Sequence, residues 1–381
     1  MNFNLTEENI EMRRKVREFA VNEVASIATR YDKSEDFIKE LIPKMAKLHL
    51  MGLVIPKEYS GAGGDYINYA IAVEELSRVD GATGITIAAH NSLCTNNIYI
   101  AGTEEQRKKF VVPLAKGEKI GAWGLTEPNA GSDASGTQTV AVLNNNEWII
   151  NGSKIFITHA AVGDIAVIMA VTDRNKGARG ISAFIVERGT SGFSTGAVEH
   201  KMGLHGSDTG ELVFDNCRVP KENLLGNLGD GFITTMKVLD GGRISIGAMA
   251  LGIAQGALDI SIKFAKERTQ FGKPIGKHEI IQTYISEMAT EVEAARLLVY
   301  RAAWMKNHKM NTTKESAMAK YYASEVAMKA TTNAIQICGG QGCLEEMDAE
   351  RKFRDAKLTE IGEGTSEIQK LVISRELLGK L

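Results

Sequence analysis

Apolar residues recur at helical spacing through the first third of the chain. Thr6, followed by Glu8 and Asn9, is typical of a helix N-cap with an acidic first turn. Further helical patterns cover 34–50, 67–79 and 103–116. The first helical face is outlined by Ile10, Val16, Phe19, Ala20 and Val24. We therefore expect residues 6 to about 118 to be helical.

The pattern changes near Gly121 to short runs rich in β-branched and aromatic residues. Residues 147–158 contain Asn151-Gly152, a dipeptide typical of hairpin turns, and predict two strands around this turn. Further strand-like runs cover 165–171, 181–187 and 211–214. From 119 to about 230 we expect a β domain of antiparallel strands, folded as a small barrel or sandwich.

After Gly231 the pattern is helical again, over longer stretches. We expect three helices here. The apolar face of the first is formed by Phe232, Met236, Leu239, Ile246, Ile253 and Ile260, and that of the second by Ile281, Ile285, Met288, Val292 and Val299. The third covers 315–337. Long helices with short connections are typical of an up-down bundle. The apolar run 244–254 is far shorter than the roughly 20 residues that span a bilayer, so we expect a buried helix and no membrane.

Helices, strands and helices thus follow one another without repeating βα units, which excludes a doubly wound nucleotide-binding fold. We predict an α+β multidomain protein with an N-terminal α-helical domain over 1–118. A middle antiparallel β domain over 119–230 and a C-terminal four-helix bundle over 231–381 follow it. A length of 381 residues agrees with two or three domains.

Charge and cysteine content narrow the class of protein. A net charge of −2 gives no electrostatic reason to expect a nucleic acid or an anionic membrane as partner. The four cysteines form no CxxC pair and have no nearby His at metal-ligand spacing, so we expect reduced, structural thiols and no metal. The N-terminus has neither an apolar signal core nor the character of a transit peptide. We expect a cytoplasmic chain, or one already processed.

The stretch from Ile361 to Glu367 is the most informative for chemistry. It places a carboxylate, Glu363, between Gly362 and Gly364 at the end of a helical region. Flanking glycines let the backbone come close to a ligand and adopt φ/ψ values that other residues avoid. This suits a general base that must touch a substrate carbon. The alternative is a glycine helix C-cap followed by a Thr/Ser start to the next helix.

A second candidate lies where the β domain opens, from Trp123 to Asp133. Small and hydroxyl residues around Pro128 can present N–H groups and Oγ atoms to a planar polar ligand, although a surface loop is the alternative. This segment is followed in order by four more motifs, which are Lys154–Thr158, Glu267–Gly272, Gln336–Gly340 and the Glu363 stretch. Together the five motifs resemble the acyl-CoA dehydrogenase family, in particular its short-chain, butyryl-CoA dehydrogenase-like members. The resemblance covers essentially the whole chain and implies the same three-part fold.

The resemblance also implies roles for individual residues. Trp123, Leu125 and Thr126 match the loop along the flavin of FAD, with Thr126 near the pyrimidine edge and Ser132 near both the cofactor and the acyl-CoA. Phe156 and Thr158 match positions that contact the isoalloxazine. Residues that match contacts to the FAD of a neighbouring subunit are Arg268, Phe271, Gln336, Gly339 and Gly340. Thr365 and Glu367 match the segment near the FAD phosphates and adenosine. Asp240, Arg243 and Gly364 match substrate contacts, the first two to the CoA portion.

The activity implied by the resemblance is removal of hydrogens from Cα and Cβ of an acyl-CoA thioester. Glu363 would take the α-proton, while its own backbone N–H and a ribityl hydroxyl of FAD polarise the thioester carbonyl. The β-hydride would pass to flavin N5, and the electrons to electron-transferring flavoprotein. A homotetramer is implied as well. The alternatives are the same scaffold acting as an enoyl-CoA reductase or an acyl-CoA oxidase, or a flavin-binding relative without this chemistry.

Four positions depart from the family pattern. Some members carry the base on the first long C-terminal helix, immediately before the Arg that matches Arg243, but here that residue is Gly242. Gly362 stands where short- and medium-chain members often have Tyr, which predicts a wider pocket that admits branched or cyclic acyl groups. Glu279 replaces a common Gln, which puts that cofactor contact in doubt. Phe156 replaces a frequent Trp and keeps an aromatic face.

Overall fold

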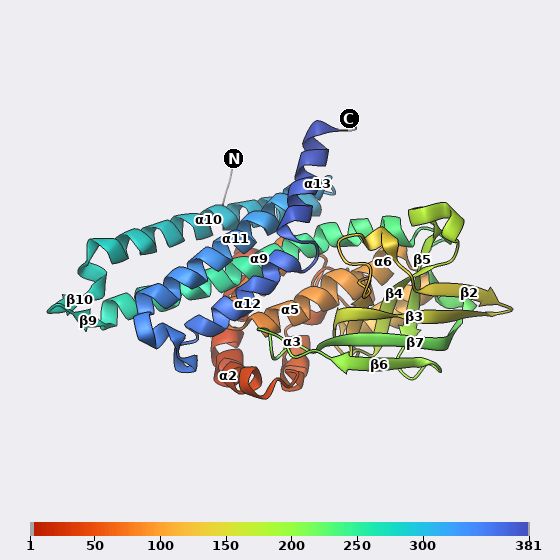
Figure 1. Cartoon of the computed structure of the whole chain (residues 1–381), viewed down its shortest axis with the longest axis horizontal. Coiled ribbons are helices and arrows are strands. Elements are labelled where there is room, and N and C mark those ends of the chain that lie inside the picture. The colour runs from red at the N-terminus through yellow and green to blue at the C-terminus, as the bar shows by residue number, and fades with distance from the viewer. Residues whose placement is uncertain (1–3, 380–381) are drawn as a thin grey trace.

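The computed structural model describes residues 4–379, so the outermost residues of the first and last predicted domains, 1–3 and 380–381, lie outside it. The molecule is elongated (Figure 1). The C-terminal bundle extends to one end of the long axis and the β domain forms the other. The N-terminal helices pack between them, against both.

The N-terminal region is helical, as the pattern predicted. Thr6 caps the first helix, because its side chain accepts from Asn9 N while the Asn9 side chain accepts from Thr6 N. The helices are α1 (Glu7–Phe19), α2 (Ala25–Ser34), α3 (Ile42–Lys47), α4 (Tyr66–Val79), α5 (Gly81–Ala88), α6 (Asn96–Ala101), α7 (Glu104–Gln106) and α8 (Val112–Ala115). Short π-helical segments η1 (Ala20–Val24), η5 (Ala89–Thr95) and η6 (Arg107–Val111) join some of them.

The predicted helical stretch over 34–50 is only partly helical. α2 ends at Ser34 because Glu35 adopts a left-handed φ of 57°. The chain then passes through the 3₁₀ turn η2 (Lys39–Leu41) into α3, which carries a proline in its first turn and ends before His49, also left-handed. Apolar spacing alone does not reveal these two reversals, because the buried side chains of the short pieces keep a helix-like period.

The middle domain is built on one eight-stranded sheet. Its strands are β1 (Gly121–Gly124), β2 (Val140–Asn144), β3 (Glu147–Thr158), β4 (Ile165–Val171), β5 (Ile181–Glu187), β6 (Phe193–Val198), β7 (Thr209–Pro220) and β8 (Leu224–Leu225). The order is β6-β7-β3-β2-β4-β5-β8, with β1 also paired to β4. Most pairs are antiparallel as predicted, but β1 and β2 each pair with β4 in parallel. The sheet is therefore mixed, because β1 and β4 are joined by a long crossover and not by a hairpin.

The predicted hairpin at Asn151-Gly152 is also wrong. Residues 147–158 form one continuous strand, and the dipeptide lies at a register shift against β7. Gly152 supplies a φ of 141°, and Asn151 Oδ1 accepts from Asn216 N across the ladder. The tight turn instead joins β2 to β3 through Asn145, whose φ is 54°. An Asn-Gly pair suits a bulge as well as a turn, since both need backbone of positive φ.

The C-terminal region is a bundle of α9 (Gly231–Glu267), α10 (Glu279–Asn307), α11 (Thr313–Cys338) and α12 (Ala349–Ile361), followed by α13 (Ser366–Leu378). A small hairpin, β9 (Thr269–Gln270) and β10 (Lys273–Pro274), joins α9 to α10 at the far end of the molecule (Figure 1). Residues 244–254 are buried within α9, as predicted. Within residues 4–379, α9 alone is long and apolar enough to cross a membrane by length and composition, but 83% of its apolar window is buried inside the protein.

One continuous apolar core joins the N-terminal helices, strands β1, β4 and β5, and the bundle. A separate cluster, including Trp148, Phe184 and Phe214, covers the other face of the sheet. The segment η5 ties the parts together, because His90 Nδ1 accepts from Gly121 N at the start of β1. Across the described range, which includes all four cysteines, each thiol is free, and Cys94, Cys217 and Cys338 are buried.

Candidate active site

Glu363 lies in the short turn that joins α12 to α13. Glu363 and Gly364 both adopt left-handed backbone, with φ of 54° and 98°. Thr365 then caps α13 by accepting from Ile368 N. The helix-start interpretation of this motif is therefore correct for Thr365, but it does not explain a strained non-glycine residue at 363.

The carboxylate of Glu363 is directed onto the bare backbone of α9. A Cβ atom on Gly242 would stand 1.8 Å from Glu363 Oε2 and 3.2 Å from Leu93 Cδ2 of η5. Oε2 is buried and has no hydrogen-bond partner among residues 4–379. Buried polar atoms are normally paired, so an orphaned carboxylate oxygen indicates a group that acts on a ligand.

Burial raises the pKa of Glu363 to about 7, and the positive charges of Arg243 and Lys320 work in the opposite direction. A carboxyl group with a pKa near neutrality can both take and return a proton at physiological pH. The side chain thus has the burial, the free oxygen and the acidity that a general base needs.

The turn that carries Glu363 is held from behind by two buried side chains. Lys320 Nζ, on α11, donates to the carbonyl of Gly364 at 2.8 Å. Gln369 Nε2, on α13, donates to the same carbonyl at 2.8 Å and to the carbonyl of Glu363 at 3.2 Å. Neither residue was singled out from the sequence.

Asp240 and Arg243 lie on α9 beside Glu363. Arg243 Nη1 donates to Asp240 Oδ1 at 2.9 Å, and Thr313 Oγ1 donates to Asp240 Oδ2 at 2.9 Å. Arg243 is 5% exposed, and its Nε has no partner in the described part of the chain. The structure thus brings these two predicted substrate residues together, near the base.

The predicted flavin residues of the middle domain also come together. Trp123 on β1 is buried, with Nε1 unpartnered within residues 4–379. Phe156 on β3 is 62% exposed and left-handed, with a φ of 58°, at a second register shift against β7. Ile155 N donates to Thr126 O at 2.9 Å, which joins the loop after β1 to β3. Leu125 and Thr126 are half-buried on that loop, Thr158 ends β3, and Ser132 is exposed.

A buried ion pair holds the loop after β1 against β3, and the sequence did not lead us to predict this pair. Lys154 Nζ contacts Glu127 Oε1 at 2.6 Å and Leu125 O at 3.3 Å. The two oxygens of Glu127 also accept from Gln138 N and Thr139 N. Lys154 was named only as the start of a motif. The sequence feature that could have indicated this ion pair is a lysine within a strand that is otherwise rich in apolar residues.

The remaining predicted cofactor residues lie elsewhere. Arg268 lies between α9 and β9, and Phe271 lies between β9 and β10, at the end of the bundle opposite the β domain (Figure 1). α11 ends at the same end of the molecule, because α9 and α11 run in the same direction (Figure 1). Gln336 lies in the last turn of α11, and Gly339 and Gly340 follow that helix. Phe271 is 93% exposed with a φ of 51°, and Cβ atoms on Gly339 or Gly340 would meet nothing within 4 Å. These five residues therefore form a second group that does not approach Trp123 or Phe156 of the same chain.

The residues fit a flavin. The exposed ring of Phe156 offers an apolar face to a planar ligand, while the unpaired Nε1 of Trp123 offers a donor. Thr365 and Glu367 lie at the N-terminal first turn of α13, where backbone N–H groups favour anions. Among residues 4–379 no group of three or more His, Cys, Asp or Glu side chains could hold a metal ion.

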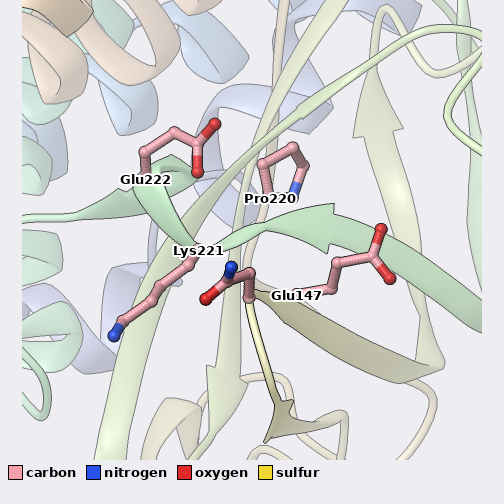
Figure 2. A pocket seen from close by; sticks show the side chains of 5 residues that line it. Glu147, Pro220, Lys221 and Glu222 are labelled. Carbon is pink, nitrogen blue, oxygen red and sulfur yellow. The ribbon is translucent and has the colours of Figure 1, made fainter.

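Figure 2 shows an open hollow at the tip of the sheet, lined by Asn146, Glu147, Pro220, Lys221 and Glu222. None of the candidate site residues lines it. The side chains of Glu147 and Lys221 point to opposite sides of the hollow (Figure 2), so they do not converge on a common ligand.

Three family models match the chain in succession. They are described as the N-terminal, middle and C-terminal domains of acyl-CoA dehydrogenase, and match residues 6–118, 122–217 and 229–378. The chain is 53% identical to the "Acyl-CoA dehydrogenase, short-chain specific" of Clostridium acetobutylicum, over 99% of this chain and 100% of that protein. It is 46% identical to the caffeyl-CoA reductase–Etf complex subunit CarC of Acetobacterium woodii, over 98% and 99%.

Solved structures of proteins from the same family are also similar to this chain. Butyryl-CoA dehydrogenase from Megasphaera elsdenii has a TM-score of 0.97 and 47% identity, covering 99% of this chain and 100% of that one. A glutaryl-CoA dehydrogenase from Mycobacterium smegmatis in complex with FADH2 has a TM-score of 0.94 and 29% identity, covering 99% and 96%. With this fold, and with family models that match the chain in succession from residue 6 to 378, the chain belongs to the acyl-CoA dehydrogenase family and is an enzyme of that class.

Proposed function

We propose that the chain catalyses FAD-dependent α,β-dehydrogenation of a short-chain, branched or cyclic acyl-CoA, with Glu363 as the base. The observation that carries this proposal is the buried, unpartnered Oε2 of Glu363 lying against Gly242. No side chain on α9 competes for that place. The nearest basic groups, Arg243 and Lys320, leave the oxygen free while favouring its ionised form.

The chain's own groups account for the proton transfer. The ionised Glu363 carboxylate takes the proton from Cα of the thioester and holds it in a buried site. The backbone N–H of Glu363 donates to no acceptor within the described residues, so it is free to polarise the thioester oxygen. Bound FAD supplies the acceptor for the hydride that leaves Cβ. Trp123, Thr126, Phe156 and Thr158 would hold its ring, and Thr365 and Glu367 would lie near its phosphates and adenosine.

The range of acyl groups is inferred from the space beside Gly362. A Cβ atom there would meet only Leu358 O at 3.5 Å and Leu358 Cγ at 3.8 Å, both ordinary contacts. The position therefore has room for a side chain that the chain does not supply. We infer that this room serves branched or cyclic acyl groups beside straight short ones. Flavin bleaching by a panel of butyryl-, isobutyryl- and cyclic acyl-CoA thioesters measures that range.

Electron-transferring flavoprotein is the proposed electron partner, and a relative 46% identical to this chain is named as part of a complex with Etf. The same relative is named a reductase, which favours reduction of an enoyl-CoA as the second candidate function. Both directions use the same base, since Glu363 returns a proton to Cα when the reaction is reversed. Acyl-CoA oxidation with O₂ as sole acceptor tests the oxidase alternative.

Assembly and location complete the proposal. Phe271, Arg268 and the Gln336–Gly340 segment lie at the end of the bundle opposite the β domain, with Phe271 93% exposed (Figure 1). We infer that they contact the FAD of a neighbouring copy in a homotetramer. A cytoplasmic location is proposed on the sequence expectation alone.

Glu363→Gln tests the central assignment. The variant keeps the size of the side chain and should retain yellow FAD and acyl-CoA binding. Bleaching of the flavin by butyryl-CoA should slow by at least ~10²-fold, within the usual contribution of a positioned base. Glu360→Gln is the matched control, because Glu360 lies on α12, just before the turn that carries Glu363, and already accepts from Lys357. Near-normal bleaching by Glu363→Gln refutes the proposal.

A further inference from the structure

Lys320 is a buried charge for which the proposed reaction has no direct use. It lies on α11 with no exposed surface, and it is among the largest fully buried side chains of the protein. Within residues 4–379 it forms no ion pair with a carboxylate; its hydrogen bond reaches the carbonyl of Gly364, 44 residues away. A buried lysine without a paired carboxylate is unfavourable unless its surroundings use it.

The carbonyl that Lys320 holds is part of the strained turn at the base. Glu363 and Gly364 have φ of 54° and 98°, left-handed backbone that is uncommon for a residue with a side chain. Gln369 supports the same turn from α13. We propose that Lys320 is a positioning residue for the base: by binding the Gly364 carbonyl and placing a positive charge behind the turn, it directs the Glu363 carboxylate over Gly242. This inference rests on the proposed role of Glu363.

Lys320 differs from the other charged groups near Glu363 in having no carboxylate partner. Arg243 faces it from α9 but is already paired with Asp240. Two further carboxylates near Lys320, Glu360 of α12 and Glu367 of α13, are exposed or paired with surface lysines. Burial raises the pKa of Tyr69 on α4, and the nearby Glu363 charge adds to this rise to a smaller extent. Lys320 is therefore a buried cation near Glu363 that forms no ion pair with any carboxylate of the described residues.

Burial lowers the pKa of Lys320 to about 8, while the nearby carboxylates, Glu363 first, work in the opposite direction. At neutral pH the ammonium is thus largely retained. Its loss would remove stabilisation from the ionised form of Glu363, so the pKa of Glu363 would rise. A merely structural lysine would have no such effect.

Lys352 offers a matched control. It is also a buried lysine with a pKa lowered to about 8, and its Nζ donates to a backbone carbonyl, Val79 O, at 3.2 Å. It lies on α12, nine positions before that helix ends at Ile361, which is about 14 Å along the helix axis, and eleven positions before Glu363. Lys352→Met therefore removes the same kind of group without touching the base.

The test compares Lys320→Met, Lys320→Arg and Lys352→Met in the FAD-loaded protein. Infrared titration follows the protonated carboxyl band that is missing in Glu363→Gln, and the rate of bleaching by butyryl-CoA is measured against pH. Lys320→Met should move both midpoints to higher pH by about one unit or more. It should also slow bleaching at neutral pH by ~10-fold or more, through misplacement of the base. Lys320→Arg, which keeps the charge, should restore the infrared midpoint.

Lys352→Met should leave both midpoints in place, even where it lowers thermal stability as much as Lys320→Met. If Lys320→Met does not retain FAD, Lys320→Gln replaces it, with the same alkaline shift expected. The inference is overturned if the Lys320 variants titrate like the unmodified protein. That outcome differs from failure of the proposed function, because Glu363→Gln would then still abolish bleaching.

Discussion

Oε2 of Glu363 lies 1.8 Å from the point at which Gly242 would carry a Cβ atom. Residue 242 can therefore carry no side chain while the carboxylate of Glu363, the proposed base, keeps this position. In family members with a base on this helix, the side chain would start from the position that Gly242 occupies. The same pocket can thus receive its carboxylate from either of two segments, but not from both.

Gly242→Ala should displace the carboxylate, since a methyl group at 1.8 Å from Oε2 cannot be accommodated without movement. A shift of about 1 Å at the base should slow butyryl-CoA-driven bleaching by ~10²-fold with FAD content unchanged. Gly241→Ala is the matched control, because a Cβ there would meet only Tyr66, at 3.6 Å from Cε1. Equal rates for the two variants would show that the contact does not position the base.

The rate should depend on pH in opposite senses in the two directions. Dehydrogenation needs Glu363 ionised, and its pKa is about 7, so kcat/KM should rise with pH through neutrality and then level off. Reduction of an enoyl-CoA needs the protonated acid, so its rate should fall over the same range. Stopped-flow rates in both directions check this. Parallel profiles would exclude Glu363 as the shared proton carrier.

Glu127→Gln should destabilise the loop after β1, which carries residues proposed to hold the flavin. It leaves Lys154, which has no exposed surface, without its charged partner. Removing one member of a buried pair typically destabilises by about 3–5 kcal/mol. Denaturant unfolding of the apoprotein and fluorescence titration with FAD would measure both consequences.

The double variant Lys154→Met with Glu127→Gln gives the comparison for that experiment. It removes the buried charge together with its partner, so it should be more stable than Glu127→Gln alone. If the double variant is instead the less stable of the two, the lysine packs well without its charge being balanced, and the pair does not fasten the loop.

Gly362→Tyr should narrow the acyl pocket. A ring at this position would fill room that the chain leaves beside the base, so the ratio of kcat/KM for isobutyryl-CoA to that for butyryl-CoA should fall ~10-fold or more. Gly362→Ala should give an intermediate ratio. An unchanged ratio in both variants would place the acyl group elsewhere.

Much of the fold follows from local patterns, because helices and strands leave different apolar periods. The helix-strand-helix order and the cap at Thr6 needed only neighbouring residues. Two local signals misled. Asn151-Gly152 supports a bulge because β7 continues alongside it, and 34–50 is broken by left-handed residues that side-chain period does not reveal.

The candidate site shows the same difference between signals that are local in the sequence and contacts that form only on folding. Glu363 was identifiable because its flanking glycines are adjacent in sequence. Lys320 was not, since its partner is a backbone carbonyl 44 residues away and a lysine in a helix is usually exposed. The contact between Glu363 and Gly242 likewise joins two segments that only the folded bundle brings together.

The length of α9 has a consequence for genetics. From Gly242 to Arg268 the chain runs 26 residues, about 39 Å at the rise of an α-helix. In the proposed homotetramer, where Phe271 contacts the FAD of a neighbouring copy, each subunit would contribute residues to two sites, its own and its neighbour's. Two inactive alleles, one altered at Glu363 and one at Phe271, should therefore complement each other when co-expressed, because some mixed assemblies contain a site with neither lesion.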